Sequence, residues 1–259
     1  MNYRFRLLLC SIGFVTACCL NAAAQISPGV VTGGASPWPV YVYDTEMLEK
    51  GNVIVSGIGG VGFLGDGTRS HSIYSELDLG ITNQFLAAFA VSGSRGEASD
   101  WKLDDTVVHA KYRILDKDTV DFAVAGIVER LPYMEDSGYS AYDGQIMAIV
   151  QAGAGGFATY GQIGYSSRKQ VFEGIGARYD FAGKAIVSGN FSYRHEGDFY
   201  QGLAPDEISG VKSTAYATVY VPAGSRVGLT GAVGRTLMPM NAGDPATWFC
   251  TFGLGVRLH

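Results

Sequence analysis

The chain has 259 residues, with 19 Lys and Arg against 24 Asp and Glu, 36 glycines and a mean hydropathy of only +0.13. Past residue 24 no apolar run approaches the roughly 20 residues that a membrane-spanning helix needs, which argues against a helical bundle in the inner membrane. No basic patch stands out, so the composition gives no indication of a nucleic-acid partner.

Residues 1–24 have the pattern of an export signal: two arginines near the start, an apolar stretch, and three alanines before the expected cleavage after Ala24. Its removal would leave 17 basic residues against 24 acidic ones, a net charge of −7, because the segment holds two of the 19 basic residues and no acidic one. The alternative is a lipoprotein acylated at Cys18, since residues 15–18 resemble a lipobox. Cleavage after Ala24 would leave Cys250 alone, so that no disulfide could form within the chain.

Residues 25–50 are rich in Pro and Gly and show no strand periodicity before Val40. Pro37 and Pro39 cannot donate to a β-ladder, which argues against a strand there. We expect a periplasmic lead-in, or a short segment that enters the interior of the following domain. A flexible tail is the alternative.

Residues 51–259 repeat one unit about twelve times, a run that alternates apolar with polar or small residues and ends in turn residues. Tight closures such as GITNQ (80–84) and FAGK (181–184) alternate with long polar ones such as RLPYMEDSGYSAYDG. Short periplasmic turns and long extracellular loops are typical of transmembrane β-barrels. The sequence therefore predicts an all-β fold, a closed antiparallel up-and-down transmembrane β-barrel of about twelve strands, with ten or fourteen as alternatives. The expected strands span residues 51–64, 70–80, 83–94, 105–116, 119–131, 144–152, 156–167, 170–181, 183–195, 208–221, 224–237 and 246–258.

The two faces of these runs differ in the way that lipid and an aqueous lumen would require. In a strand, residues i and i+2 share a face, so Val108 and Tyr112 oppose Lys111, and Phe252 opposes Thr251. A soluble sandwich would also alternate, but with its apolar face inside; long loops on one side only, behind an export signal, favour the membrane barrel.

Aromatic residues of the apolar parity gather near the ends of the expected strands, where interfacial rings prefer to lie. The sequence therefore predicts two aromatic girdles. Those near the short turns are Phe85, Tyr112, Phe122, Phe157 and Tyr179, and those near the long loops are Tyr165, Tyr193 and Trp248.

Twelve strands should enclose a lumen wide enough for a small solute but easily narrowed by charged side chains. Acids on the second expected strand and bases on the fourth would lie on one inner face, two strands apart. They could form a transverse field that orients a polar or aromatic solute, or an ion-pair network that fills the barrel. The predicted lumen lining is Glu76, Asp78, His109, Lys111, Arg113, Arg178, Arg194, Lys212, Tyr216, Tyr220 and Arg257.

Catalytic patterns are weak. His71 stands between Ser70 and Ser72, but neighbours on a strand point to opposite faces, which is poor geometry for a Ser–His pair. His195 lies at an outer loop and could serve as a general base, whereas no H-E-x-x-H spacing occurs. We therefore predict no catalytic residues, no metal ligands and no cofactor, with an outer-membrane hydrolase kept as a rival.

Five short motifs are spread over nearly the whole mature chain: TEMLEKGN (45–52), LGITNQ (79–84), KYRIL (111–115), LP (131–132) and GLGVRL (253–258). They resemble motifs of the outer-membrane transporters of the phenol meta-pathway family. That resemblance implies uptake of exogenous, often hydrophobic or aromatic, compounds across the outer membrane.

Together these patterns predict a bacterial outer-membrane channel or transporter for passive uptake of small molecules. Its expected partners are the lipid bilayer and lipopolysaccharide, the outer-membrane assembly machinery and a small solute, with no nucleic acid. The first rival is a structural or adhesive barrel with a plugged lumen, and the second is the hydrolase.

Overall fold

The computed structural model describes residues 42, 44–63, 67–96, 99–130, 141–167, 169–195, 211–239 and 248–258; the expected export signal lies outside them. Within these ranges the chain forms twelve strands and no helix. The strands are β1 (Val53–Phe63), β2 (Arg69–Thr82), β3 (Phe85–Gly96), β4 (Lys102–Asp116), β5 (Val120–Arg130), β6 (Tyr142–Ala154), β7 (Phe157–Ser166), β8 (Val171–Asp180), β9 (Ile186–Arg194), β10 (Val211–Pro222), β11 (Val227–Pro239) and β12 (Trp248–Arg257).

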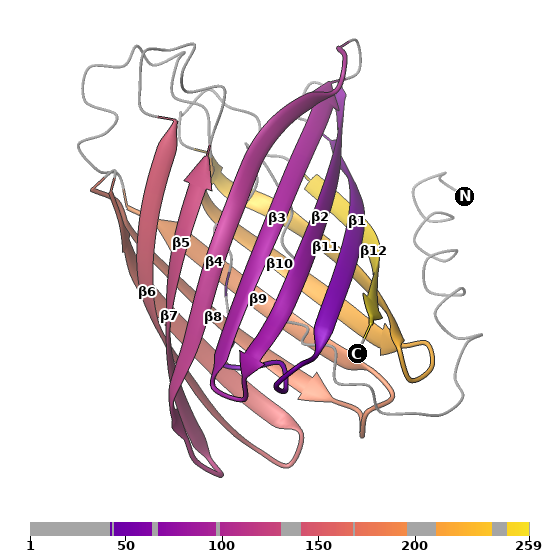
Figure 1. The fold of residues 1–259 in the computed structure, drawn as a ribbon. Helices are drawn as coiled ribbons and strands as arrows, with labels where there is room; N and C mark the ends of the chain where they lie inside the picture. The colour runs from indigo at the N-terminus through magenta and orange to yellow at the C-terminus, as the bar shows by residue number, and fades with distance from the viewer. Residues whose placement is uncertain are drawn as a thin grey trace.

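The strands form one closed barrel in which each pairs antiparallel with its neighbours in sequence (Figure 1). The ring closes where β1 pairs with β12. The predicted fold class, a closed up-and-down barrel of twelve strands, is confirmed, and most strand boundaries agree with the sequence pattern to within three residues. No helix among the described residues is long and apolar enough to span a membrane.

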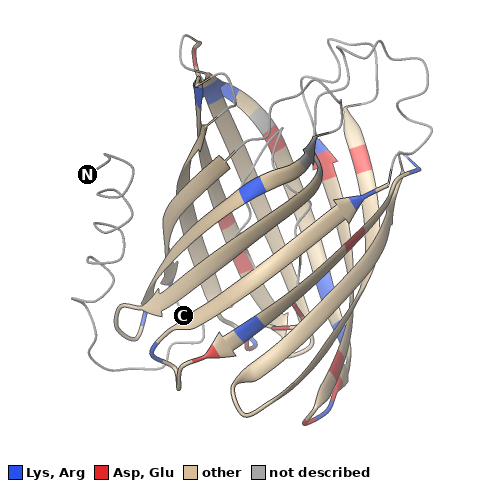
Figure 2. Ribbon diagram, turned by 180° about the vertical axis from the view of Figure 1, so that it is seen from behind, with Lys and Arg blue, Asp and Glu red and all other residues tan. Residues whose placement is uncertain are grey.

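The barrel is apolar outside and mainly polar inside. Val108 and Phe252 are 53% and 59% exposed, whereas their neighbours His109 and Thr251 are 5% and 8% exposed. Charged residues occupy few positions along the strands (Figure 2). The predicted alternation of faces is therefore confirmed, and such an exterior is expected where the outer face of a barrel contacts lipid.

The residues expected to form aromatic girdles lie on the outer face. Tyr112, Phe157 and Tyr179 are exposed near the short turns, and Tyr165 and Trp248 are exposed toward the other end. Phe85, Phe122 and Tyr193 are partly buried. Tyr179 also packs edge-on against Phe181 with ring centroids 4.7 Å apart.

Inward-facing rings lie over glycines of an adjoining strand. A Cβ at any of these glycines would overlap the ring, so the glycine makes room for the aromatic side chain. This packing fills space inside the barrel. The four pairs are Phe172 over Gly164, Tyr160 over Gly176, Tyr220 over Gly228 and Phe249 over Gly234.

The segment before β1 enters the barrel from the end that carries the short turns. The Gly51 N–H donates to the Gly80 carbonyl at 2.8 Å, and the Lys50 N–H donates to Asn83 Oδ1 at 2.9 Å. Leu48, only 2% exposed, packs against an inward-facing cluster that includes Tyr220. Residues 44–48 therefore occupy part of the lumen.

Candidate functional site

β2 and β4 supply acidic and basic side chains to the inner face of the barrel. β3, which lies between them, lets these side chains meet. In the register, Asp78 of β2 lies opposite Ala88 of β3, and Ala88 lies opposite His109 of β4. Glu76 lies opposite Ala90 in the same way. Alanine projects little from the sheet, so longer side chains of β2 and β4 can approach one another over β3.

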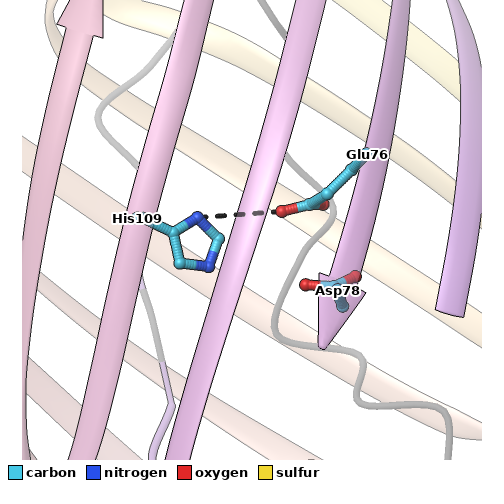
Figure 3. Close-up of side chains that lie close together, drawn as sticks. All are labelled: Glu76, Asp78 and His109. Carbon is cyan, nitrogen blue, oxygen red and sulfur yellow. Dashed lines mark ion pairs between the residues drawn. The ribbon is translucent and has the colours of Figure 1, made fainter. Parts of the chain in front are cut away.

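Glu76, Asp78 and His109 point toward one another across β3 (Figure 3). His109 Nδ1 lies 3.8 Å from Glu76 Oε1, and one donor atom of each residue lies within 4.8 Å of the others. All three are buried, Glu76 to 2% and Asp78 to 5% exposure. Both carboxylate oxygens of Glu76 and Oδ1 of Asp78 have no hydrogen-bond partner among the described residues.

Residues 44–48, which we call the lumen segment, are held by ion pairs to the barrel wall. Lys111 Nζ donates to the Asp44 carbonyl oxygen at 3.2 Å and lies 3.8 Å from Asp44 Oδ1. Arg178 Nη1 donates to Asp44 Oδ2 at 3.0 Å, and Arg178 Nη2 donates to Glu46. The Thr45 hydroxyl donates to Asp121 Oδ2 at 3.4 Å. Burial of a charged side chain is tolerated when the charge is paired and hydrogen-bonded. These contacts therefore fix the lumen segment against β4 and β8.

Glu46 shows the strength of this pairing. Burial alone would raise the pKa of Glu46, but the charge of the Arg178 guanidinium and the hydrogen bond that it donates hold the pKa below its ordinary value of 4.5. Glu46 is therefore ionised at neutral pH and binds Arg178 as a carboxylate.

These contacts form one cluster, which we call the charged cluster: Asp44, Glu46, Glu76, Asp78, His109, Lys111 and Arg178. Counted with all four carboxylates ionised and His109 neutral, the four negative charges and the positive charges of Lys111 and Arg178 leave a formal charge of −2.

The part of the wall formed by β10 to β12 is rich in hydroxyls. The Val42 N–H donates to the Tyr216 hydroxyl oxygen at 3.3 Å, and the Ser188 and Thr218 hydroxyls lie 2.6 Å apart. We call this region the hydroxyl wall. Its inward members on β10 to β12 are Thr214, Tyr216, Thr218, Tyr220, Thr230, Thr236 and Thr251.

A third part of the lumen is apolar, which the alternation of faces alone did not predict. Ala125, Ile127, Met147 and Ile149 of β5 and β6 are inward-facing and buried. They belong to a buried cluster that also includes Phe172 of β8. The lumen therefore offers apolar as well as charged surface.

The remaining predicted lining residues lie nearer the ends of the strands. Arg113 pairs with Asp116 at 2.8 Å beside a short turn. Arg194 and Arg257 are partly buried on inward positions of β9 and β12. Lys212 belongs to β10, but its side chain lies outside the described ones. A role of these residues in a solute path stays a prediction.

The histidines considered for catalysis lie apart from the charged cluster. His195 Nε2 is 3.4 Å from Glu173 Oε1, and both side chains are about half exposed. His71 and Ser72 occupy adjacent positions of β2, and Ser72 is buried on the inward parity.

The sequence pattern missed Asp44 and Glu46. They precede the first strand, in a stretch without period-two alternation, so no face could be assigned to them. The only signal available in the sequence was a pair of acidic residues just before a barrel whose predicted lining held more basic than acidic residues.

The architecture is that of known twelve-strand barrels. The structure of the KdgM porin in complex with disordered oligogalacturonate matches with a TM-score of 0.55 and 10% identity, covering 80% of this chain and 99% of that one. The COG4313 outer-membrane channel from Pseudomonas putida F1 matches at 0.57 and 13%, covering 85% and 100%. The NanC porin matches at 0.58 and 7%, covering 79% and 100%. At such identities the likeness shows the fold alone.

No family model matches the chain, and no curated protein is similar to it in sequence. The resemblance to phenol meta-pathway transporters therefore stays a prediction.

Proposed function

We propose that this protein is a bacterial outer-membrane channel for passive uptake of small molecules. The observation that carries the proposal is that the barrel is apolar outside and polar inside. Apolar side chains such as Phe252 cover the outer face, while Lys111 and the hydroxyl wall line the lumen. The fold that the chain shares with the KdgM and NanC porins and the COG4313 channel supports the same function.

The lumen chemistry narrows the solute class. Lys111 and Arg178 are engaged by the carboxylates of the lumen segment, so the charged cluster has a formal excess of negative charge when its carboxylates are ionised. That excess disfavours small anions. The apolar cluster around Met147 and Ile149 suits a solute with a hydrophobic or aromatic part. We therefore propose neutral or cationic solutes that carry such a part, which agrees with the class that the family resemblance implies.

The lumen segment controls the passage in this proposal. It meets the wall beside a cavity of about 260 Å³ at the short-turn end, whose lining includes Glu46, Asp121, Gln151 and Arg178. A solute that crosses the barrel has to pass this narrowed end.

Planar-bilayer recording on refolded protein tests the proposal. Wild type should show small, discrete conductance steps, and the Asp44→Ala/Glu46→Ala variant should conduct at least about two-fold more, because its segment loses the pairs to Lys111 and Arg178. Glu49→Ala is the matched control, since Glu49 is an exposed acid directly after the lumen segment. Absence of steps in wild type and in both variants would remove the channel function.

The second candidate is a structural barrel with a permanently plugged lumen. It is favoured by one observation, the burial of Asp44 and Leu48 inside the barrel. Liposome swelling with uncharged solutes of graded size separates the two functions: a channel admits the smaller solutes, and a plugged barrel admits none. We assign no catalytic role, since Ser72 and His71 lie on opposite parities of β2.

A further inference from the structure

We propose that Glu76, Asp78 and His109 form a binding site for one divalent first-row transition-metal ion in the barrel wall. The site does not depend on the proposed channel function, and nothing in the sequence pattern predicts it. It joins β2 to β4 across β3, at the level where the lumen segment is attached.

The first argument is the donor set. One imidazole nitrogen and two carboxylates suit a borderline cation such as Zn²⁺ or Co²⁺ better than Ca²⁺ or Mg²⁺, which prefer oxygen ligands alone. Donors bound to one tetrahedral Zn²⁺ at about 2.1 Å lie roughly 3.4 Å apart. His109 Nδ1 and Glu76 Oε1 are already 3.8 Å apart, and all three donors lie within 4.8 Å of one another. Small side-chain rotations suffice to bring them onto one ion.

The second argument is the unused hydrogen-bonding capacity. Glu76 Oε1 and Oε2 and Asp78 Oδ1 are buried and accept no hydrogen bond from the described residues. Unsatisfied carboxylate oxygens in a buried place are costly. A metal ion bound between these side chains would be coordinated by the carboxylate oxygens and would compensate for the missing hydrogen bonds (Figure 3).

The third argument is charge. Lys111 and Arg178 are engaged by Asp44 and Glu46, and neither Glu76 nor Asp78 contacts a Lys or Arg side chain among the described ion pairs. When both are ionised, the two carboxylates balance the charge of one divalent cation. Lys111 also acts electrostatically on Glu76, Asp78 and His109. Its positive charge opposes the metal, so removing it should tighten binding.

Zn²⁺ titration of the full protein, refolded in detergent without a histidine tag and freed of metal by a chelator, tests the site. Isothermal titration calorimetry should show one Zn²⁺ per chain. The variants Glu76→Gln, Asp78→Asn and His109→Gln should each weaken it at least about ten-fold. Co²⁺ should give a visible absorption spectrum of a mixed nitrogen and oxygen site, abolished by Zn²⁺. This spectrum is recorded on wild type and does not depend on the folding of any variant.

Matched controls use the other histidine–carboxylate pair and the free thiol. His195→Gln removes the exposed pair with Glu173, and Cys250→Ser removes the exposed cysteine. Both should keep full Zn²⁺ affinity. The metal should raise the melting temperature of wild type and of these controls, but not of the three ligand variants.

Three results would overturn the assignment: no saturable binding of Zn²⁺ or Co²⁺, binding lost in His195→Gln or Cys250→Ser, or equal affinity for Mg²⁺ and Zn²⁺. The first denies a site, the second places it elsewhere, and the third contradicts a transition-metal ligand set.

Discussion

The charged cluster and the hydroxyl wall face the same lumen but are held in different ways. On β2, β4 and β8, side chains are fixed by opposite charges, as in the pairing of Arg178 with Asp44. On β10 to β12, aromatic rings pack over glycines, as Tyr220 does over Gly228. The charged cluster therefore depends on electrostatic balance and the hydroxyl wall on shape, and changes in each should act differently.

The largest effect is expected from Lys111→Met. It removes one of the two cations that pair with the buried Asp44 carboxylate, and breaking a buried ion pair typically costs about 3 kcal/mol or more. Thr251→Val on the hydroxyl wall should cost about 1 kcal/mol or less, because Thr251 Oγ1 has no hydrogen-bond partner among the described residues. Urea unfolding in lipid vesicles measures both. Equal losses would show that charge does not distinguish the two regions.

Gly234→Ala tests the packing of the hydroxyl wall. The added Cβ would overlap the Phe249 ring, and overpacking of this kind costs roughly 1 to 3 kcal/mol. Gly57→Ala is the matched substitution, since a Cβ at Gly57 meets nothing within 4 Å. The same unfolding assay should find Gly57→Ala neutral or slightly stabilising; a similar loss in both variants would contradict the role of ring packing.

Acid should loosen the lumen segment. Because the folded-state pKa of Glu46 lies below 4.5, its contribution is present above that pH and is lost as the pH falls through the lowered value. We expect a loss of about 1 kcal/mol or less in the attachment of the segment. Conductance should therefore rise as the pH falls below 4.5 in wild type, and Glu46→Gln should show a smaller rise. An identical pH response in the two proteins would exclude Glu46 as its origin.

The smallest effect is expected at the exposed pair of His195 and Glu173. Water screens such a pair, so Glu173→Gln should change stability by less than about 0.5 kcal/mol. A loss comparable to that of Lys111→Met would show that pairing contributes equally in exposed and buried places.

The barrel itself was predictable from the sequence because alternation is a local property. Val108 and His109 differ in polarity, and a strand must send them to opposite faces. Turn residues such as those at 80–84 then set the ends of the strands. The same reasoning placed Glu76 and Lys111 on one inner face.

The meeting of Glu76, Asp78 and His109 was not predictable with the same certainty. It depends on the register of β2, β3 and β4, and on the small size of Ala88 between Asp78 and His109. A shift of one residue would have sent these side chains to the other face. The attachment of Asp44 depends on tertiary contacts more than 60 positions away, which no local pattern encodes.

The seam between β1 and β12 sets the order in which the ring can be completed. Ten residue pairs join the indigo and yellow strands of Figure 1, and Ile54 meets Arg257 across more than 200 positions of chain. Every other pairing is a hairpin between consecutive strands, which are close in sequence and can therefore pair early. Ring completion is therefore expected to be the slowest step of assembly. Until it occurs, β1 presents a free edge that can pair with another polypeptide.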